Sequence, residues 1–371
     1  MTVPAGPALS PLAAERLRAQ LLLGPPARSV TAVTGHLLAV QAQDPRGARL
    51  AVRARTSGLV AADVDRALTD DRSVVVSWLN RGTLHLVLAE DYWWLHQLIT
   101  PQLLTGIKRR LAQEGVTADD AERGVRVIEE SLAADGPLTR PQLRDRVAAA
   151  GVRTLGQAIV YIFALATFHG LIVRGPMHGR EQAFVLVRDW LGAPPKPVDR
   201  DQALAMLAHR YLAGHGPAAE KDLAKWAGLP LGDARRGLAA IAPKLADRDD
   251  GLASLAPPGG EPPVPPVRLL GAFDPLLLGW ASRDLFLATE GPIITSNGLF
   301  RPFVLRHGRG SALWAITRGQ VVTDPLGPLT APEQAALAAE VTDVTRFLGG
   351  GPASRRAGRA SSGSRTAARS R

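Results

Sequence analysis

The sequence feature that most restricts the fold is a helix start that occurs twice. The dipeptide Gly-Pro stands at 136–137 and again at 216–217, and in both copies a leucine follows seven residues after the glycine within a short helical pattern. Helix-turn-helix units begin in this way. After the first copy, apolar segments at 171–174 and 184–187 are joined by a Gly-Pro-rich loop, which predicts a pair of strands. Helices followed by a strand pair are typical of a winged helix, so the sequence predicts this module in tandem.

Length and composition fit a soluble protein of several domains. The chain has 371 residues, 46% of them hydrophobic, which is enough for about two or three domains. No segment approaches the roughly 18 consecutive apolar residues of a membrane span, and residues 1–10 lack the basic start and apolar centre of a signal peptide. We therefore expect a cytoplasmic protein that has no membrane partner.

The sequence also excludes several classes of cofactor. Without cysteine it cannot hold a disulfide, an iron–sulfur cluster or a thiolate zinc site. It lacks the Gly-x-Gly-x-x-Gly, P-loop and His-Glu-x-x-His motifs. Its eight histidines show no metal-ligand spacing. We expect neither a metal nor a cofactor.

We expect an α+β fold, mainly helical, in which three tandem winged-helix modules precede a C-terminal β-rich domain. The modules are expected at 1–116, 117–197 and 198–262, and the β-rich domain at 263–348. Segment 349–371 has six arginines and no acid. It cannot form a core, so we expect a disordered basic tail whose attraction to polyanions is salt-sensitive.

Hydrophobic periodicity and turn residues predict the individual elements. Helices are expected at 11–22, 29–43, 61–68, 90–100, 101–111, 119–134, 158–168, 201–213 and 331–347. Strands are expected at 74–79, 83–88, 171–174, 184–187, 267–270, 284–288, 292–294, 303–305 and 312–316.

The segment Gln41-Ala42-Gln43-Asp44-Pro45 is the candidate site. Pro45 disfavours helical conformation at the residue before it, so a helix must end here. If the segment is extended, both glutamine side chains lie on one side and can hold a single water; in a helix they diverge by about 200°. Two solvated glutamines at a helix end remain the alternative.

Several motifs together resemble one known family. They are Gln41-Ala42-Gln43, the sequence RGTLH at 81–85 followed by AED at 89–91, the two Gly-Pro helix starts, and LGAFDPLLLG at 270–279. This set, spread over about residues 10–345, resembles the helix-turn-helix 42 superfamily of DNA glycosylases, the AlkZ and YcaQ group, which resolve alkylated and crosslinked DNA. Gln41-Ala42-Gln43 is similar to the Gln-hydrophobic-Gln catalytic motif of AlkZ-like members, whereas the YcaQ branch has Gln-x-Asp.

The resemblance implies a monofunctional DNA glycosylase of base excision repair that hydrolyses the N-glycosidic bond of N7-alkylated purines. Bulky adducts or interstrand crosslinks of a genotoxic natural product are included, because some AlkZ-like members act in self-resistance. Gln41 and Gln43 would be the catalytic residues. A guanine alkylated at N7 is already cationic and leaves without a general acid, so the enzyme has to place a water and stabilise an oxocarbenium-like transition state. Amides can do both, although they cannot abstract a proton strongly.

The expected partner is double-stranded DNA that contains alkylated bases, bound by a monomer. The alternative is a non-enzymatic winged-helix DNA-binding protein, such as a transcriptional regulator. Regulators of this kind usually read palindromes as dimers, and the chain shows no dedicated dimerisation helix. A lesion binder without catalytic activity is a third possibility. Only an enzyme needs the glutamine pair.

Basic residues at three places are candidate DNA contacts. We expect Arg81 and His85, at the turn and strand of the first module, to have a structural role or to contact a phosphate. We expect a phosphate contact in the wing of the second module, from Arg174, His178 and Arg180. The strongest contact outside the motif is expected from the cluster in the β-rich domain, which consists of Arg301, Arg306, His307 and Arg309.

Two further features of the C-terminal part bear on the site. Where the family pattern has an Asp-Gly turn followed by Gly-Thr-Trp, segment 307–314 reads HGRGSALW, which predicts a longer and more basic loop. Asp274 stands before a proline, which is typical of a turn, so we expect it to brace the backbone rather than to act in catalysis.

Overall fold

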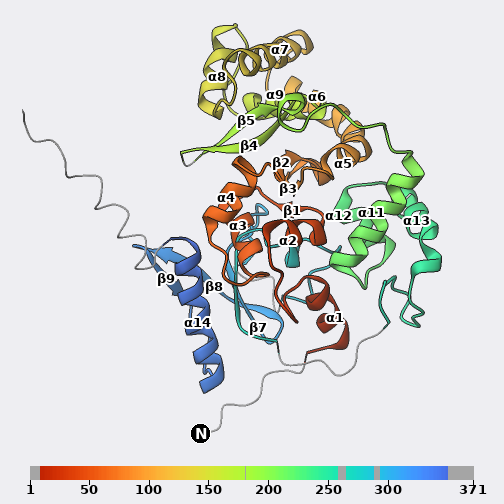
Figure 1. Cartoon of the computed structure of the whole chain (residues 1–371), viewed down its shortest axis with the longest axis vertical. Coiled ribbons are helices and arrows are strands. Elements are labelled where there is room, and N and C mark those ends of the chain that lie inside the picture. Colours follow the sequence, from red (N-terminus) through yellow and green to blue (C-terminus); the bar gives the residue numbers. More distant parts are fainter. Residues whose placement is uncertain (1–8, 180, 258–264, 288–292, 350–371) are drawn as a thin grey trace, which may run out of the picture.

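The computed structural model describes residues 9–179, 181–257, 265–287 and 293–349 (Figure 1). They form an α+β fold of helices and two antiparallel sheets, which confirms the mixed fold class. Each helix among them is too short or too polar to cross a bilayer. The basic tail expected after Gly349 lies outside the described residues.

The helix expected at 29–43 ends earlier than the sequence indicates. It stops at Leu37 because Leu38 has a positive φ of 63°. The four N-terminal helices are α1 (Pro11–Ala19), α2 (Val30–Leu37), α3 (Pro45–Arg53) and α4 (Ala61–Thr69). Between α2 and α3 the chain runs through strand β1 (Val40–Gln41), and the Asp44 side chain then caps α3. Where a helix was expected, Gln41 therefore ends a strand and Gln43 lies in a bend.

A five-stranded antiparallel sheet occupies the centre of the molecule (Figure 1). Its order is β1, β3 (Leu84–Leu88), β2 (Val74–Trp78), β4 (Ile172–His178) and β5 (Glu181–Leu186). Strands β2 and β4 pair through Val76 and Arg174. The sheet therefore joins the segments expected to form the first and second modules.

Six helices precede or follow β4 and β5 in the chain, and those of residues 118–168 form the top of the molecule in Figure 1. They are α5 (Tyr92–Ile99), α6 (Leu104–Gln113), α7 (Ala118–Asp135), α8 (Arg140–Ala149), α9 (Ala158–Phe168) and α10 (Val187–Trp190). Helix α9 begins and ends where the sequence predicts. It consists almost entirely of apolar side chains, and most of them are buried.

The next three helices pack against the N-terminal part of the chain. They are α11 (Arg200–His215), α12 (Glu220–Ala227) and α13 (Leu231–Ala240). Helix α11 contacts α1, α2 and α5, and α12 contacts η1 (Asn80–Gly82), the 3-10 turn between β2 and β3. The other 3-10 helices are η2 (Thr100–Leu103), η3 (Ala242–Lys244) and η4 (Pro275–Leu277). This packing brings the end of α12 close to the five-stranded sheet that contains Gln41.

The C-terminal part is a four-stranded antiparallel sheet with a helix lying along it (Figure 1). Its order is β6 (Arg268–Leu270), β7 (Phe303–Arg306), β8 (Arg309–Thr317) and β9 (Gln320–Thr323), and the helix is α14 (Ala331–Phe347), as predicted. Strand β9 was not predicted. A strand was expected at 284–288. The residues of this segment that the structure describes, 284–287, form a turn that ends in a single bridge between Leu287 and Gly310.

The longer loop expected at 307–314 is wrong. His307 and Gly308 alone connect β7 to β8, with φ values of 51° and 73°. Two residues with positive φ form the tight hairpin turn that matches strand twist. The additional residues of this segment belong to β8, whose register against β7 shifts between Val304 and Leu305.

Candidate active site

Gln41 and Gln43 lie between α2 and α3, Gln41 at the end of strand β1 and Gln43 in the bend that follows it. Gln41 ends β1 and pairs with His85 of β3 in antiparallel register. The N–H of Ala42 donates to the carbonyl of Leu84 at 2.8 Å, which continues the pairing by one residue. The helical alternative, in which the two glutamines diverge, therefore does not occur.

The two glutamine amides are fixed by different donors. Gln41 is buried, and its Oε1 accepts a hydrogen bond from Arg81 Nη2 at 3.1 Å. Gln43 is exposed, and its Oε1 accepts one from the backbone N–H of Leu84 at 3.2 Å. Each oxygen keeps a second lone pair, and each NH2 group brings two donors. Each amide can therefore both accept and donate a hydrogen bond.

Arg81 donates hydrogen bonds to other residues of the protein. Besides Gln41, its guanidinium donates through Nη1 to the carbonyl of Trp226 and, at 3.5 Å, to that of Lys225, both at the end of α12. Burial lowers the pKa of Arg81, and the charge of Arg283 lowers it further. The sequence left open a structural role or a phosphate contact, and these bonds favour the structural role.

His85 is buried beside the same residues. Its Nδ1 donates to the carbonyl of Thr83 at 2.9 Å, because a carbonyl can only accept. Burial lowers the pKa of His85 to about 3, and the charge of Arg81 contributes in the same direction. A neutral imidazole offers no positive charge to a phosphate, so the geometry again favours the structural role.

Arg174 of β4 lies between two aromatic rings. Its guanidinium carbon is 4.9 Å from the ring centroid of Trp78 and 5.0 Å from that of Phe184. Burial and, to a smaller extent, the charge of Arg140 together lower the pKa of Arg174 to about 10, so the side chain stays charged at neutral pH. Cation–π contacts of this kind fix the position of a charge without neutralising it.

Arg174 also lines a cavity of about 290 Å³ that reaches the glutamine segment. Pro45, two residues after Gln43, forms part of its wall. The lining residues are Pro45, Arg140, Pro141, Arg174, Met177, Glu181, Gln182 and Phe184. His178 is exposed at the end of β4, and Arg180 lies outside the described residues.

The cationic cluster expected on the β-rich part is largely occupied by internal bonds. Arg306 and His307 both contact Glu333 of α14, at 2.6 and 2.8 Å. The hydrogen bond from Arg306 is the largest cause that lowers the pKa of Glu333 to about 2. Arg309 donates to the carbonyls of Asp284 and Leu287. Internal bonds thus occupy Arg306, His307 and Arg309, whereas Arg301 is exposed, and the DNA contact expected of this cluster stays a prediction.

Asp274 braces the backbone, as predicted. It accepts a hydrogen bond from the N–H of Leu276 at 3.0 Å and forms a fully buried ion pair with Arg55, which follows α3, at 2.8 Å. Arg55 also donates to the carbonyl and to the side chain of Gln20. The sequence gave no signal for this partner, because the two charges are 219 positions apart. The contact ties the helix after the glutamines to the C-terminal part.

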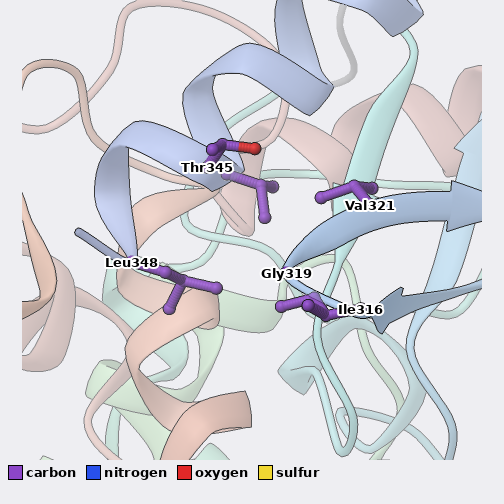
Figure 2. Close-up of a pocket in the computed structure, with 6 residues that line it drawn as sticks. Ile316, Gly319, Val321, Thr345 and Leu348 are labelled. Atoms are coloured by element: carbon purple, nitrogen blue, oxygen red, sulfur yellow. The ribbon is translucent and has the colours of Figure 1, made fainter. Parts of the chain in front are cut away.

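A second cavity is chemically unlike the glutamine segment. It lies between the β8–β9 hairpin and α14 (Figure 2) and has a volume of about 180 Å³. Its lining residues are Ile316, Gly319, Val321, Val344, Thr345 and Leu348, none of them ionisable. Among the described residues, no three His, Asp or Glu side chains are grouped closely enough to hold a metal ion.

Comparison with known proteins agrees with this geometry. The family model of AlkZ-like DNA glycosylases matches residues 34–347, which include both glutamines. An interstrand DNA cross-link repair glycosylase from Streptomyces sahachiroi is 28% identical over 364 residues, which cover 90% of this chain and 95% of that protein. The solved structure of Streptomyces sahachiroi DNA glycosylase AlkZ aligns with a TM-score of 0.73 and 26% identity, over 91% of this chain and 95% of that one. The chain thus belongs to the AlkZ-like DNA glycosylase family and is a hydrolase of N-glycosyl bonds.

Proposed function

We propose that this glycosylase hydrolyses the N-glycosidic bond of N7-alkylated purines, with Gln41 and Gln43 as its catalytic residues. The observation that supports this most is the pair of amides two residues apart on a non-helical segment, each with its oxygen held by a donor. The similarity to a glycosylase named for interstrand cross-link repair supports bulky or crosslinked adducts as substrates. Self-resistance to a genotoxic natural product is the corresponding biological role.

The proposed reaction needs no general acid. When the glycosidic bond breaks, its electron pair goes to the purine and neutralises the positive charge that alkylation placed there, while the sugar becomes an oxocarbenium-like cation. A water held by Gln41 and Gln43 adds to the anomeric carbon, and its proton passes to solvent. Oriented amide dipoles stabilise the developing cation, a type of contribution worth about 10²–10³ in rate.

We propose a restricted set of DNA contacts around this site. Arg174, His178, Arg180 and Arg301 remain candidates for phosphate contacts, and the cavity that Arg174 shares with Pro45 supports a path for the backbone near the glutamines. The partner is double-stranded DNA with alkylated bases, bound by a monomer. Since the substrate is DNA, we propose the cytoplasm as the compartment.

We also propose the modular organisation on which this DNA path rests. Helices α7–α9 followed by β4 and β5, and α11–α13 with the bridge between Ala218 and Ala253, support winged-helix modules at 117–197 and 198–262. A first module at 1–116 contributes β1, β2 and β3 to the shared sheet, and a β-rich domain follows at 263–348.

A monofunctional mechanism is part of the proposal. Lys225 adjoins Trp226 at the end of α12, close to Arg81 in space although 144 positions away in sequence. A glycosylase that forms a Schiff base through this amine would be trapped on DNA by borohydride. We expect no trapped complex during excision by the wild type.

The test is base release from duplex DNA that carries one N7-methylguanine or one bulky N7 adduct. Wild type and the double variant Gln41→Ala with Gln43→Ala are compared for released base, for abasic sites and for DNA affinity. We expect release by the wild type alone and equal DNA affinity of both proteins. Binding to undamaged duplex without release from either adduct would favour the regulator instead.

A further inference from the structure

Arg81 is held by features that place it next to Gln41. It has a positive φ of 57° within η1, a conformation that costs a non-glycine residue about 1 kcal/mol or more. Gly228, the residue after α12, lies directly against it. A Cβ at Gly228 would stand 3.0 Å from Arg81 N and 3.2 Å from Arg81 Cα, and Gly228 itself has φ 73°. This close approach therefore requires glycine.

The guanidinium then connects α12 to the glutamine. Nη1 donates to the carbonyl of Trp226, where the C-terminal end of the helix dipole favours a positive charge. Nη2 donates to Gln41 Oε1 at 3.1 Å. These acceptors are neutral, and among the described residues Arg81 takes part in no ion pair. A planar fork that donates in two directions can hold two groups at a fixed separation.

We propose that Arg81 is a positioning residue that sets the orientation of the Gln41 amide and is itself set by the end of α12. The inference rests on the proposed catalytic role of Gln41. An amide can rotate by about 180° and exchange its oxygen and nitrogen at little cost in shape. With Arg81 in place, rotation would put an NH2 group against a guanidinium, so the oxygen stays toward Arg81. Helix α12 thereby contributes to the active site without touching the substrate.

A phosphate contact is the competing role for Arg81, and the salt dependence of DNA binding distinguishes the two. Removing one phosphate contact weakens affinity and lowers the slope of log K against log salt by about one. Removing a positioning residue slows excision at saturating enzyme and leaves the slope unchanged. Arg144→Ala serves as the matched control, since Arg144 is an exposed arginine paired only with its neighbour Asp145.

The experiment measures single-turnover release of N7-methylguanine at saturating enzyme, together with DNA affinity at several salt concentrations. For Arg81→Ala we expect a rate lower by about 10–100-fold, with the dissociation constant within about 2-fold of wild type. Arg81→Lys, which keeps the charge without the fork, should recover only part of the rate. Gly228→Ala, which displaces Arg81 without removing an arginine, should also slow excision. Unchanged rates with a reduced salt slope would overturn the proposal.

A crystal structure of the Arg81 variant at better than about 1.2 Å resolution, where the amide oxygen and nitrogen can be told apart, gives a readout that does not depend on activity. We expect the Gln41 side chain to adopt more than one orientation in Arg81→Ala, and to keep one in Arg144→Ala. An unmoved Gln41 amide would overturn the inference. If Arg81→Ala does not fold, the same comparison is made in Arg81→Lys. A wild type that releases no base overturns the proposed substrate, and the crystal structures still decide the role of Arg81.

Discussion

Two arginines, the buried Arg55 after α3 and the half-buried Arg81 beside Gln41, have partners of different charge. Arg55 forms an ion pair with Asp274 in which neither side chain is exposed, and Gln20 accepts further bonds. Within the part of the chain that the structure describes, Arg81 donates to amide and backbone carbonyl oxygens alone, and burial lowers its pKa. The first charge is neutralised and connects two parts of the fold. The second is not neutralised and orients a neighbour, which is the arrangement of a group used for function.

The largest expected effect comes from breaking the Arg55 pair. Asp274→Ala leaves a guanidinium buried without its carboxylate and removes an acceptor from the Leu276 N–H. We expect the free energy of unfolding to fall by about 3–5 kcal/mol. Denaturant titration checks this, with Asp145→Ala in an exposed pair as the control, expected within about 0.5 kcal/mol. A loss below about 1 kcal/mol would contradict the structural role assigned to the Arg55–Asp274 ion pair.

The single glutamine variants should lower activity about equally but stability unequally. We expect Gln41→Ala and Gln43→Ala each to slow single-turnover excision by about 10²–10³-fold. Gln41→Ala should also cost about 1 kcal/mol of unfolding free energy, because Arg81 loses a buried acceptor. Gln43 is exposed, so Gln43→Ala should cost less than about 0.5 kcal/mol. Equal stability losses would contradict the difference between the two amides.

Acid should destabilise the protein through His85. Its folded-state pKa of about 3 lies below the usual value of 6.5, so the unfolded chain takes up a proton first as the pH falls. This contribution is complete above pH 6.5 and decreases toward pH 3, by about 1.4 kcal/mol per pH unit. His85→Gln should therefore show a shallower loss of unfolding free energy between pH 6.5 and 5. An identical slope in both proteins would show that His85 is not buried in its neutral form.

The smallest effect is expected at the β7–β8 turn. Glu333→Gln removes the charge that pairs with Arg306 and His307 near the surface, which should cost about 0.5–1 kcal/mol of unfolding free energy. Because these cations are assigned to internal bonds, DNA affinity should stay within about 2-fold of wild type. A large gain in affinity would return Arg306 and His307 to the set of DNA contacts.

The sequence predicts elements well where the signal is local. The bounds of α9 follow from a continuous apolar pattern, and those of α14 follow from a periodic pattern that begins at a capping box. The break of the helix at Leu38 was missed because a leucine with positive φ leaves no mark in the sequence. Partners distant along the chain were missed for the same reason: Arg81 meets Trp226 145 positions later, and Arg306 meets Glu333 27 positions later. Motif resemblance identified the glutamines, but not what holds them.

The central claim is that two oriented amides suffice because the leaving base is already cationic. The most direct measurement compares excision of N7-methylguanine and of the neutral lesion hypoxanthine from the same duplex, by wild type and by the Gln41→Ala, Gln43→Ala double variant. We expect the wild type to release N7-methylguanine and the double variant to lose this activity. With either protein, hypoxanthine should stay in the DNA. Comparable release of hypoxanthine, or undiminished release of N7-methylguanine by the double variant, would contradict it.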